Sequence, residues 1–341
     1  MPREPIISAG PQRDEEFDRG LRPQTIKEMI GQRDVIERLN IIVDAARKRG
    51  EPLGHILFDG PPGLGKTTFA NCLPRELNVP LITASGPAIK APKDLLPFLT
   101  NMEERAIFFI DEIHRLPKAV EEYLYTAMED FRLDIILGEG INARTINMRI
   151  KPFTLIGATT RAGLLSAPLR DRFTTREHLG FYSLPELTEI VRRSAKKLRV
   201  ALADDAAIEI ARRSRDTPRI ANNRLKWVRD YADSLSGGQA TLPVTQAALA
   251  MAGVDVLGLD KQDRHYLETI IRVFGGGPAG VEAVAHTINL EPDTLTDEVE
   301  PYLLRSELVV RTPRGRVVTA KAYQHLNMAT PPPTTPQQQL F

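Results

Sequence analysis

Cysteine and histidine are scarce in this 341-residue chain. Cys72 is the single cysteine, and the six histidines are scattered along the sequence. One thiol excludes an internal disulfide and a cysteine-based zinc site, and the histidines lack the spacing of metal ligands. We therefore expect no metal site built from protein ligands alone, and we expect a reducing, cytoplasmic compartment.

Net charge and long apolar runs are also nearly absent. The formal net charge is +1, so any contact with nucleic acid or membrane needs a local charged patch. No apolar run approaches the ~20 residues that a membrane span requires, and the N-terminus lacks the apolar core of a signal peptide. The composition is that of ordinary globular domains, and the length exceeds what one core usually organises, so we expect two or three domains.

Short apolar runs alternate with amphipathic segments between about residues 21 and 182. The runs are HILFD (55–59), VPLITAS (79–85), AIFFID (106–111) and FTLIGAT (153–159). Nearly continuous runs rich in Ile, Leu and Phe are typical of parallel strands that helices cover on both faces. We therefore predict a doubly wound α/β domain over 21–182, preceded by a loose polar arm over 1–20.

Helical spacing dominates the next region. Four segments between 183 and 254 show it with no strand between them, which predicts a small helical domain. Residues 255–330 fit three helices (about 260–273, 279–289 and 294–305) followed by a hairpin, the order of a winged helix. The tail 331–341 holds too much proline and glutamine to pack and is expected to be disordered.

The segment HILFDGPPGLGKTTFA carries the most specific signal. Residues 60–67 fit the pattern G-x-x-x-x-G-K-T between a predicted strand and a predicted helix, as in a P-loop. Glycines let backbone N–H groups curl around phosphate oxygens at a helix N-terminus. Lys66 is expected to reach the β- and γ-phosphates of ATP, and the Thr67 hydroxyl to ligate Mg²⁺. The alternative, a chance glycine-rich turn, is disfavoured by the flanking strand and helix.

An acidic pair follows the strand AIFFID. Asp111 stands at the carboxyl end of that strand, and Glu112 comes next. An aspartate beside a P-loop can hold Mg²⁺ through water, and a neighbouring glutamate can orient and deprotonate the attacking water. The alternative is an acidic helix start, which the helix dipole favours. Together with the P-loop upstream, the pair favours ATP hydrolysis.

Two further sites in the sequence, Thr159–Thr160 and Arg219, suit a nucleotide-dependent machine. Thr159 and Thr160 end the buried strand FTLIGAT, where a hydroxyl can sense the γ-phosphate or the attacking water. Arg219 stands at the start of a helix just after Pro218. From there it can lean onto the γ-phosphate and couple hydrolysis to domain rotation. By itself, Arg219 would be interpreted as a solvated helix residue.

Arginines also follow the last predicted strand, in the motif LRDRF. Arg170 and Arg172 lie on a loop expected to be exposed, where an arginine finger can stabilise the charge of a transition state. A finger that acts in trans requires an oligomer. The alternative is a surface ion pair with Asp171, which would be common and contribute little.

In this order the motifs resemble an AAA+ ATPase, and the wider set is similar to the RuvB family of bacterial Holliday-junction branch-migration motors. The resemblance covers about residues 21–326. It rests on LRPQTIKEMIGQ, GPPGLGKTT, FIDEIHRL, AMEDFRLDIILGEG, TLIGATTRAGLL, PLRDRF, TPRIAN, the GGP of 276–278 and RTPRGR. It implies an ATP-driven, Mg²⁺-dependent hexamer on double-stranded DNA, acting in recombination and repair, with RuvA as the tether to the junction and RuvC as a further partner.

Functional positions of the family carry over to the residues that match its motifs. Nucleotide contacts are implied for Leu21, Arg22, Gly63, Gly65, Lys66, Thr67, Thr68, Glu129, Asp130, Phe131, Arg172, Tyr182 and Arg219, with Thr67 and Asp111 at the metal. The catalytic set is Lys66, Asp111, Glu112, Thr159, Arg172 and Arg219. Arg172 matches the trans-acting finger better than Arg170. Arg311 and Arg316 match DNA contacts of the head, in a turn that by itself could be a solvated hairpin tip.

Residues 133–150 fit two strands around a Gly-Glu-Gly turn. Apolar side chains are expected to be exposed on this hairpin, namely Ile135, Ile136, Leu137 and Ile141. Exposed apolar hairpins are aggregation liabilities unless they bind a partner. The resemblance implies docking on RuvA, which we favour over the alternative that the hairpin folds back onto its own domain.

Four residues in three segments depart from the family pattern. Pro74 falls inside the helix after the P-loop, where an interior proline costs ~3 kcal/mol and kinks a helix. Asn223 and Arg224 stand where Arg-Leu is usual, which puts the packing of the small domain in doubt. Thr174 replaces a usual glycine, so the loop after the finger is expected to be stiffer.

Two other functions are compatible with an AAA+ ATPase domain. A clamp-loader-like ATPase is disfavoured because such proteins usually carry a helical collar where this chain has a winged helix. A winged-helix regulator with an ATPase that only gates oligomerisation is disfavoured because Glu112 and Arg172 are both present. The last five residues, Gln337–Phe341, resemble a short motif that docks on the sliding clamp, which is a weak signal in a biased tail.

Overall fold

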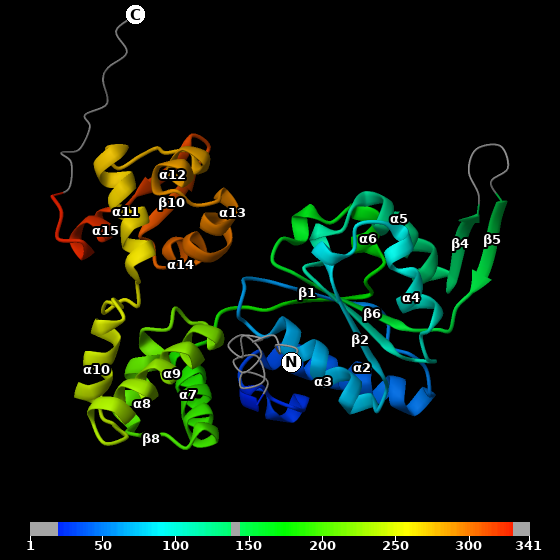
Figure 1. Ribbon diagram of the computed structural model, residues 1–341, viewed down its shortest axis with the longest axis horizontal. Coiled ribbons are helices and arrows are strands. Elements are labelled where there is room, and N and C mark those ends of the chain that lie inside the picture. Colours follow the sequence, from blue (N-terminus) through cyan, green and yellow to red (C-terminus); the bar gives the residue numbers. More distant parts are fainter. Residues whose placement is uncertain (1–19, 138–143, 330–341) are drawn as a thin grey trace, which may run out of the picture. The chain divides into compact units, whose positions relative to one another are not determined.

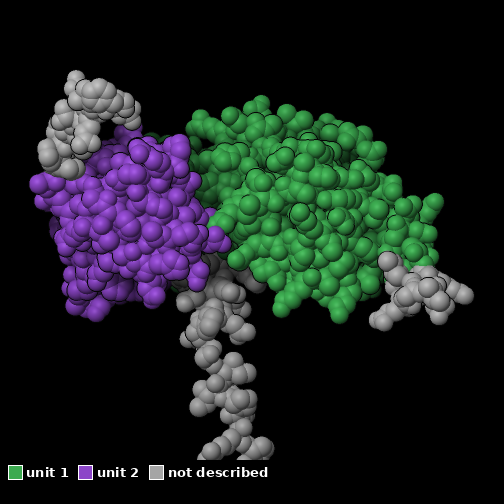
Figure 2. All heavy atoms as spheres, turned by 90° about the horizontal axis from the view of Figure 1, so that it is seen from above, with its two compact units in different colours: residues 1–199 green, residues 200–341 purple. Residues whose placement is uncertain are grey.

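The computed structural model describes residues 20–137 and 144–329. The chain divides into two compact units, 1–199 and 200–341 (Figures 1 and 2). The expected arm and tail, the clamp motif at 337–341 and Ile141 lie outside the described residues, as do the side chains of Ile136 and Leu137. The domain boundaries expected at 182/183 and 254/255 stay predictions. In the described part of the chain, every helix is too short or too polar to cross a membrane.

A five-stranded parallel sheet forms the centre of the first unit. Its order is β2 (Leu81–Ser85), β3 (Ile107–Asp111), β6 (Thr154–Thr159), β1 (Ile56–Asp59) and β7 (Thr175–His178). The four predicted strands are confirmed. The fifth, β7, was missed because its sequence TREH holds no apolar run: it lies at the sheet edge, and Glu177 is its one buried side chain.

Helices cover both faces of this sheet, with α2 and α3 on one side and α4 to α6 on the other (Figure 1). Their bounds are α2 Arg33–Arg49, α3 Lys66–Leu77, α4 Leu96–Thr100, α5 Lys118–Glu129, α6 Ala167–Asp171 and α7 Leu184–Leu198, with short 3-10 turns such as η1 (Ile26–Glu28) and η4 (Ile113–Arg115). Pro74 lies in the last turn of α3, buried, and the helix ends at Asn78 in the left-handed conformation. Thr174 is anchored, because its hydroxyl donates to the His55 carbonyl at 3.1 Å.

The hairpin of residues 133–150 extends from this unit as an antiparallel pair, β4 (Arg132–Leu137) and β5 (Arg144–Arg149) (Figure 1). Its base packs on the core, since Leu133 is fully buried and Ile135 and Met148 contact the main hydrophobic cluster. The expectation that Ile135 is exposed was therefore wrong, because the first residues of β4 pack against the core of the domain. Ile146 on β5 is 48% exposed.

The second unit begins with the helices α8 (Asp204–Arg212), α9 (Pro218–Leu235) and α10 (Leu242–Met251). Two-residue strands β8 (Ala201–Leu202) and β9 (Gln239–Ala240) pair in parallel among them. The expectation of no strand in this region was wrong in this detail, because two residues are too few to leave a periodic signal in the sequence.

The rest of the unit is a winged helix, as the sequence predicted. Its elements are α11 (Lys261–Val273), α12 (Val281–Ile288), α13 (Pro292–Thr294), the π-helix η7 (Leu295–Val299), α14 (Glu300–Arg305), β10 (Val309–Thr312), β11 (Gly315–Val318) and α15 (Ala320–His325). Its core gathers side chains of α11, α12, α14 and the hairpin around Tyr266 and Leu303.

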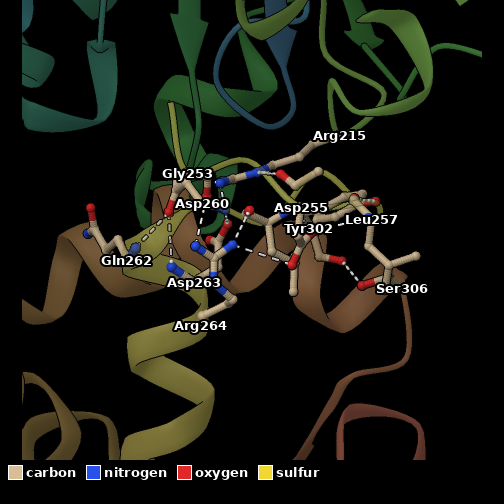
Figure 3. A network of polar contacts seen from close by, with 12 residues as sticks. Arg215, Gly253, Asp255, Leu257, Asp260, Gln262, Asp263, Arg264, Tyr302 and Ser306 are labelled. Carbon is tan, nitrogen blue, oxygen red and sulfur yellow. Dashed lines mark hydrogen bonds and ion pairs between the residues drawn. The ribbon is translucent and has the colours of Figure 1, made fainter. Parts of the chain in front are cut away.

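A buried polar network joins the first helices of this unit to α11 (Figure 3). Arg215 donates to the Gly258 carbonyl at 3.0 Å and to Asp260 at 2.5 Å, and it also pairs with Asp263. Arg224, one of the departures from the family pattern, is 8% exposed and donates to the same Gly258 carbonyl at 2.8 Å. Burial lowers the pKa of Arg224 to about 10. The unusual arginine is thus accommodated inside the unit by a backbone carbonyl.

Candidate nucleotide site and DNA-binding hairpin

The P-loop lies between β1 and α3. Three of its glycines have positive φ, at 125° for Gly60, 80° for Gly63 and 110° for Gly65. At Gly60 a Cβ atom would lie 2.4 Å from the Leu179 carbonyl oxygen, so the close approach to the neighbouring chain also requires glycine. Lys66 opens α3, is 6% exposed, and donates from Nζ to the carbonyls of Gly60 at 2.6 Å and Pro61 at 2.8 Å. The loop therefore curls around the ammonium group at a helix N-terminus, which is the geometry of a phosphate cradle.

The two residues expected at the metal meet beside this loop. The Thr67 hydroxyl donates to Oδ2 of Asp111 at 3.2 Å, although the two residues lie on α3 and β3. Within the described residues no three His, Cys, Asp or Glu side chains cluster as a metal cage. One hydroxyl and one carboxylate suit Mg²⁺, which is usually held by few protein ligands together with phosphate oxygens and water.

Glu112 stands directly after the end of β3 in a strained backbone conformation. Its φ of 50° and ψ of 45° lie in the left-handed region, which is uncommon for a residue other than glycine. Its N–H donates to Oδ1 of Asp111 at 3.0 Å. Strain of this kind persists where surrounding contacts impose it, often at functional sites.

Sequence reasoning missed His114, which lies between Glu112 and Thr159. Its Nδ1 is 3.3 Å from Oε2 of Glu112 and 2.9 Å from the Thr159 hydroxyl oxygen, and its side chain is 7% exposed. Thr159 is fully buried, whereas Thr160 is partly exposed. The motif FIDEIHR contains the histidine, but only the sheet order places it beside the end of β6.

The proposed finger, Arg172, caps the C-terminus of α6. Its Nη2 donates to Oε2 of Glu129 at 2.8 Å, and its guanidinium lies 4.4 Å from the ring centroid of Tyr125. Asp171 pairs with Arg176 at 2.9 Å. The alternative of a surface ion pair between Asp171 and Arg170 or Arg172 is therefore replaced by a pair with a different arginine. The structure thus brings together Arg172 and Glu129, two residues for which the resemblance implied nucleotide contact.

Other expected pocket residues fall into two groups. Tyr182 is 3% exposed and donates to the Leu64 carbonyl at 3.0 Å, and burial raises its pKa to about 12. It therefore contacts the P-loop directly. Asp130 and Phe131 follow α5 beside Glu129; Asp130 pairs with Arg132, and the Phe131 ring packs edge-on against a core phenylalanine.

Leu21, Arg22, Thr68 and Arg219 complete the set. Leu21 is 7% exposed, and its carbonyl and that of Arg22 accept from Lys197 on α7. Thr68 lies in the first turn of α3. Arg219 is the second residue of α9, exposed, in the other compact unit.

In the winged helix, two arginines converge on one buried carboxylate. Glu300 has no exposed side-chain surface and accepts from Arg311 at 2.5 Å, from Arg316 at 2.8 Å and from Tyr266 at 2.9 Å. Burial opposes ionisation, but the hydrogen bonds from Arg316 and Arg311 hold the pKa of Glu300 below its usual value. Arg316 is 16% exposed and Arg311 49%, so the two hairpin arginines differ in their access to solvent. Glu300 itself was not predicted.

Three family models match consecutive parts of the chain. They are the Holliday junction DNA helicase RuvB P-loop domain over residues 21–179, the RuvB AAA lid domain over 182–255 and the RuvB C-terminal winged helix domain over 256–327. The chain belongs to the RuvB family. It is therefore an AAA+ P-loop ATPase and a Holliday junction branch migration motor, and the predicted fold class is confirmed.

Relatives of the RuvB family support this over nearly the whole length. The branch migration complex subunit RuvB of Rhodopirellula baltica is 64% identical over 311 residues, which are 91% of this chain and 85% of that protein. The solved RuvB branch migration motor of Thermotoga maritima is 45% identical, with a TM-score of 0.85 over 92% of this chain and 100% of that one. A mutant of the same protein is 46% identical, with a TM-score of 0.86 over 91% of this chain and 99% of that one.

Proposed function

We propose that the chain works as a homohexamer around double-stranded DNA and turns ATP hydrolysis into movement of a four-way DNA junction. The observation that carries the proposal is the Thr67–Asp111 contact beside Lys66, in a chain that also holds a winged helix. Residues for ATP hydrolysis and a DNA-binding fold in one chain suit a motor better than a passive DNA-binding protein.

At the phosphates, Lys66 and the P-loop N–H groups bind the β- and γ-phosphates, with Gly63, Gly65 and Thr68 shaping the cradle. Thr67 and Asp111 hold Mg²⁺, which when bound neutralises phosphate charge. Tyr182 packs over the loop, and Leu21 and Arg22 line the rest of the pocket. The contact of Tyr182 with Leu64 supports this placement.

Glu112 accepts a proton from the attacking water. Its backbone N–H donates to Asp111, the same carboxylate that accepts from the Thr67 hydroxyl. A carboxylate within hydrogen-bond reach of water contributes typically 10²–10⁴-fold to such a step. The exposed Arg219 acts as the sensor of the second unit and binds the γ-phosphate.

Arg172 acts on the nucleotide of a neighbouring subunit. Within the protomer, Glu129 and Tyr125 hold the guanidinium at the end of α6. From there it exchanges these contacts for the phosphate of the neighbouring subunit's nucleotide. Asp130 and Phe131 follow Glu129 in the chain and belong to the same subunit interface. Thr159 contributes to γ-phosphate sensing together with Thr160.

The partners follow from the family and from local surfaces. RuvA docks on the hairpin 133–150, a proposal supported by the 48% exposed Ile146. RuvC joins the complex in the cytoplasm, and the sliding clamp is a weak further candidate through Gln337–Phe341. On DNA, Arg311, Arg316 and the exposed Arg314 contact phosphates without reading sequence.

Branch migration on a synthetic four-way junction tests the function. We expect heteroduplex product with ATP and RuvA, and none when Glu112→Gln replaces the wild type, although that variant still binds ATP. ATPase turnover should rise with duplex DNA. Normal multiple turnover by Glu112→Gln would reject the role of Glu112, and absence of product with active wild-type ATPase would reject the motor.

A further inference from the structure

We propose that His114 is a positioning residue for hydrolysis, which orients the Glu112 carboxylate through an imidazole that is itself hydrogen-bonded to Thr159. The inference rests on the proposed function of Glu112 and deepens it. His114 touches neither nucleotide nor metal in this proposal; it acts on the base.

The three residues meet because β3 and β6 are neighbours in the sheet. Ile110 of β3 is in register with Gly157 of β6, so the polar residues that follow both strands emerge at one edge. The short turn η4 then returns the chain across the end of β6. There a Cβ on Gly157 would lie 3.0 Å from a side-chain atom of Ile113. This packing holds Ile113, the residue that precedes His114, against β6.

The backbone of Glu112 is likewise immobilised. Its N–H donates to Asp111, and its carbonyl accepts from the Arg115 N–H at 2.9 Å. A Cβ added to Gly86 would lie 2.3 Å from that carbonyl oxygen. With the main chain held, the position of the carboxylate depends on what its oxygens contact, and Nδ1 of His114 is within 3.3 Å of one of them.

One ring nitrogen therefore lies close to two oxygens. An ionised carboxylate only accepts hydrogen bonds, so the proposed hold on Glu112 requires the proton on Nδ1. The same nitrogen lies 2.9 Å from the Thr159 hydroxyl, which also accepts from the Arg161 N–H at 2.9 Å. A stronger bond to either oxygen weakens the other, so displacement of Thr159 changes the hold on Glu112.

This arrangement links the two ends of the proposed γ-phosphate site. Thr159 is buried and Thr160 is accessible, and the two are adjacent at the end of β6. Because the imidazole is 7% exposed, water competes little for these bonds.

A buried histidine can also be merely structural, and His55 illustrates the contrast. It is 8% exposed, and its two nitrogens contact backbone groups, the Met128 carbonyl at 3.0 Å and the Leu155 N–H at 2.8 Å. His114 contacts instead two side chains at the end of the strands that carry the hydrolysis residues. The contacts, rather than burial, indicate the role.

Three substitutions test the proposal in the full-length chain. Asn places an amide N–H near the position of Nδ1, whereas Gln places it near Nε2 and Ala removes it. We expect His114→Ala and His114→Gln to lower kcat for ATP by about 10–100-fold, the usual effect of losing a supporting contact. His114→Asn should recover most of that loss. KM and the affinity for a fluorescent ATP analogue should stay within about twofold in all three.

The controls separate this inference from the function on which it rests. Without ATP hydrolysis by the wild type, the proposed function fails. With active wild type, His114→Ala at the wild-type rate, or His114→Asn as slow as His114→Ala, overturns the role of His114. In a Glu112→Gln background, His114→Ala should have no further effect. His286→Ala, an exposed histidine of α12, should leave turnover unchanged.

Discussion

Nε of Arg316 lies 2.8 Å from Oε1 of Glu300, a carboxylate with no exposed side-chain surface. Arg316, for which the resemblance implied a DNA contact, is thus mostly buried in the winged-helix domain. Tyr266 and Arg311 complete the contacts of the same carboxylate. These contacts hold the wing hairpin against the helices of the domain.

The first prediction separates the contribution of Arg316 to stability from the proposed DNA contact of Arg314. Arg316→Ala should lower the unfolding free energy by about 1–3 kcal/mol, because a buried carboxylate loses a charged partner. Arg314→Ala, exposed at the turn, should change stability by less than about 0.5 kcal/mol and reduce the salt dependence of DNA binding by about one unit of slope. Urea unfolding and DNA titrations at several salt concentrations measure both. Equal stability of wild type and Arg316→Ala would show that the ion pair contributes nothing.

The second prediction concerns the finger. Lys66→Ala and Arg172→Ala should each abolish ATP turnover, but a mixture of the two variants should recover part of it. In mixed rings, the intact P-loop of an Arg172→Ala subunit faces the intact arginine of a Lys66→Ala neighbour. Steady-state ATPase assays over a range of mixing ratios test this. No recovery, in mixtures shown to form mixed rings, would place the finger in cis.

The third prediction compares two buried arginines. In the described part of the chain, Nη1 of Arg224 has no hydrogen-bond partner, and Gly258 keeps a donor from Arg215 if Arg224 is removed. Arg224→Leu should therefore be neutral or stabilising by about 1 kcal/mol. Arg215→Leu should cost about 3–5 kcal/mol, because Asp260 and Asp263 lose their cation. Urea unfolding at pH 8 gives both values, and a strong loss with Arg224→Leu would contradict the first.

The fourth prediction is the pH dependence that Asp263 contributes. Burial raises its pKa to about 7, and this outweighs the attraction of Arg215. Because the folded pKa exceeds the unfolded one, the folded state holds the proton more tightly. Between about pH 4 and pH 7 this carboxyl should make stability fall as pH rises, by at most ~1.4 kcal/mol per pH unit.

Asp263→Asn is the matched variant for that measurement. The wild type minus variant difference in unfolding free energy should decline from pH 4 to pH 7 and level off above it. Other titrating groups are common to both proteins, so the difference isolates this site. A difference independent of pH would show that Asp263 stays ionised throughout, as a simple ion pair with Arg215.

Much of the molecule follows from local sequence. The P-loop and the acidic pair could be predicted because their chemistry depends on residues close together in the chain, placed where a buried strand ends. The order of sheet, helical region and winged helix could be predicted because period and run length differ among them. β7, β8 and β9 were missed, since polar or two-residue strands leave no such pattern.

The contacts between distant segments depend on the tertiary structure. Ile135 packs against the core because the base of its hairpin lies on the domain, and no local sequence pattern indicates this contact. His114 lies beside Thr159, and Arg316 beside Glu300, because a sheet order and a helix packing bring them there. The local sequence determines which chemical groups are present and where strands end. Which groups share a proton or a buried charge is decided by the packing of elements far apart in sequence.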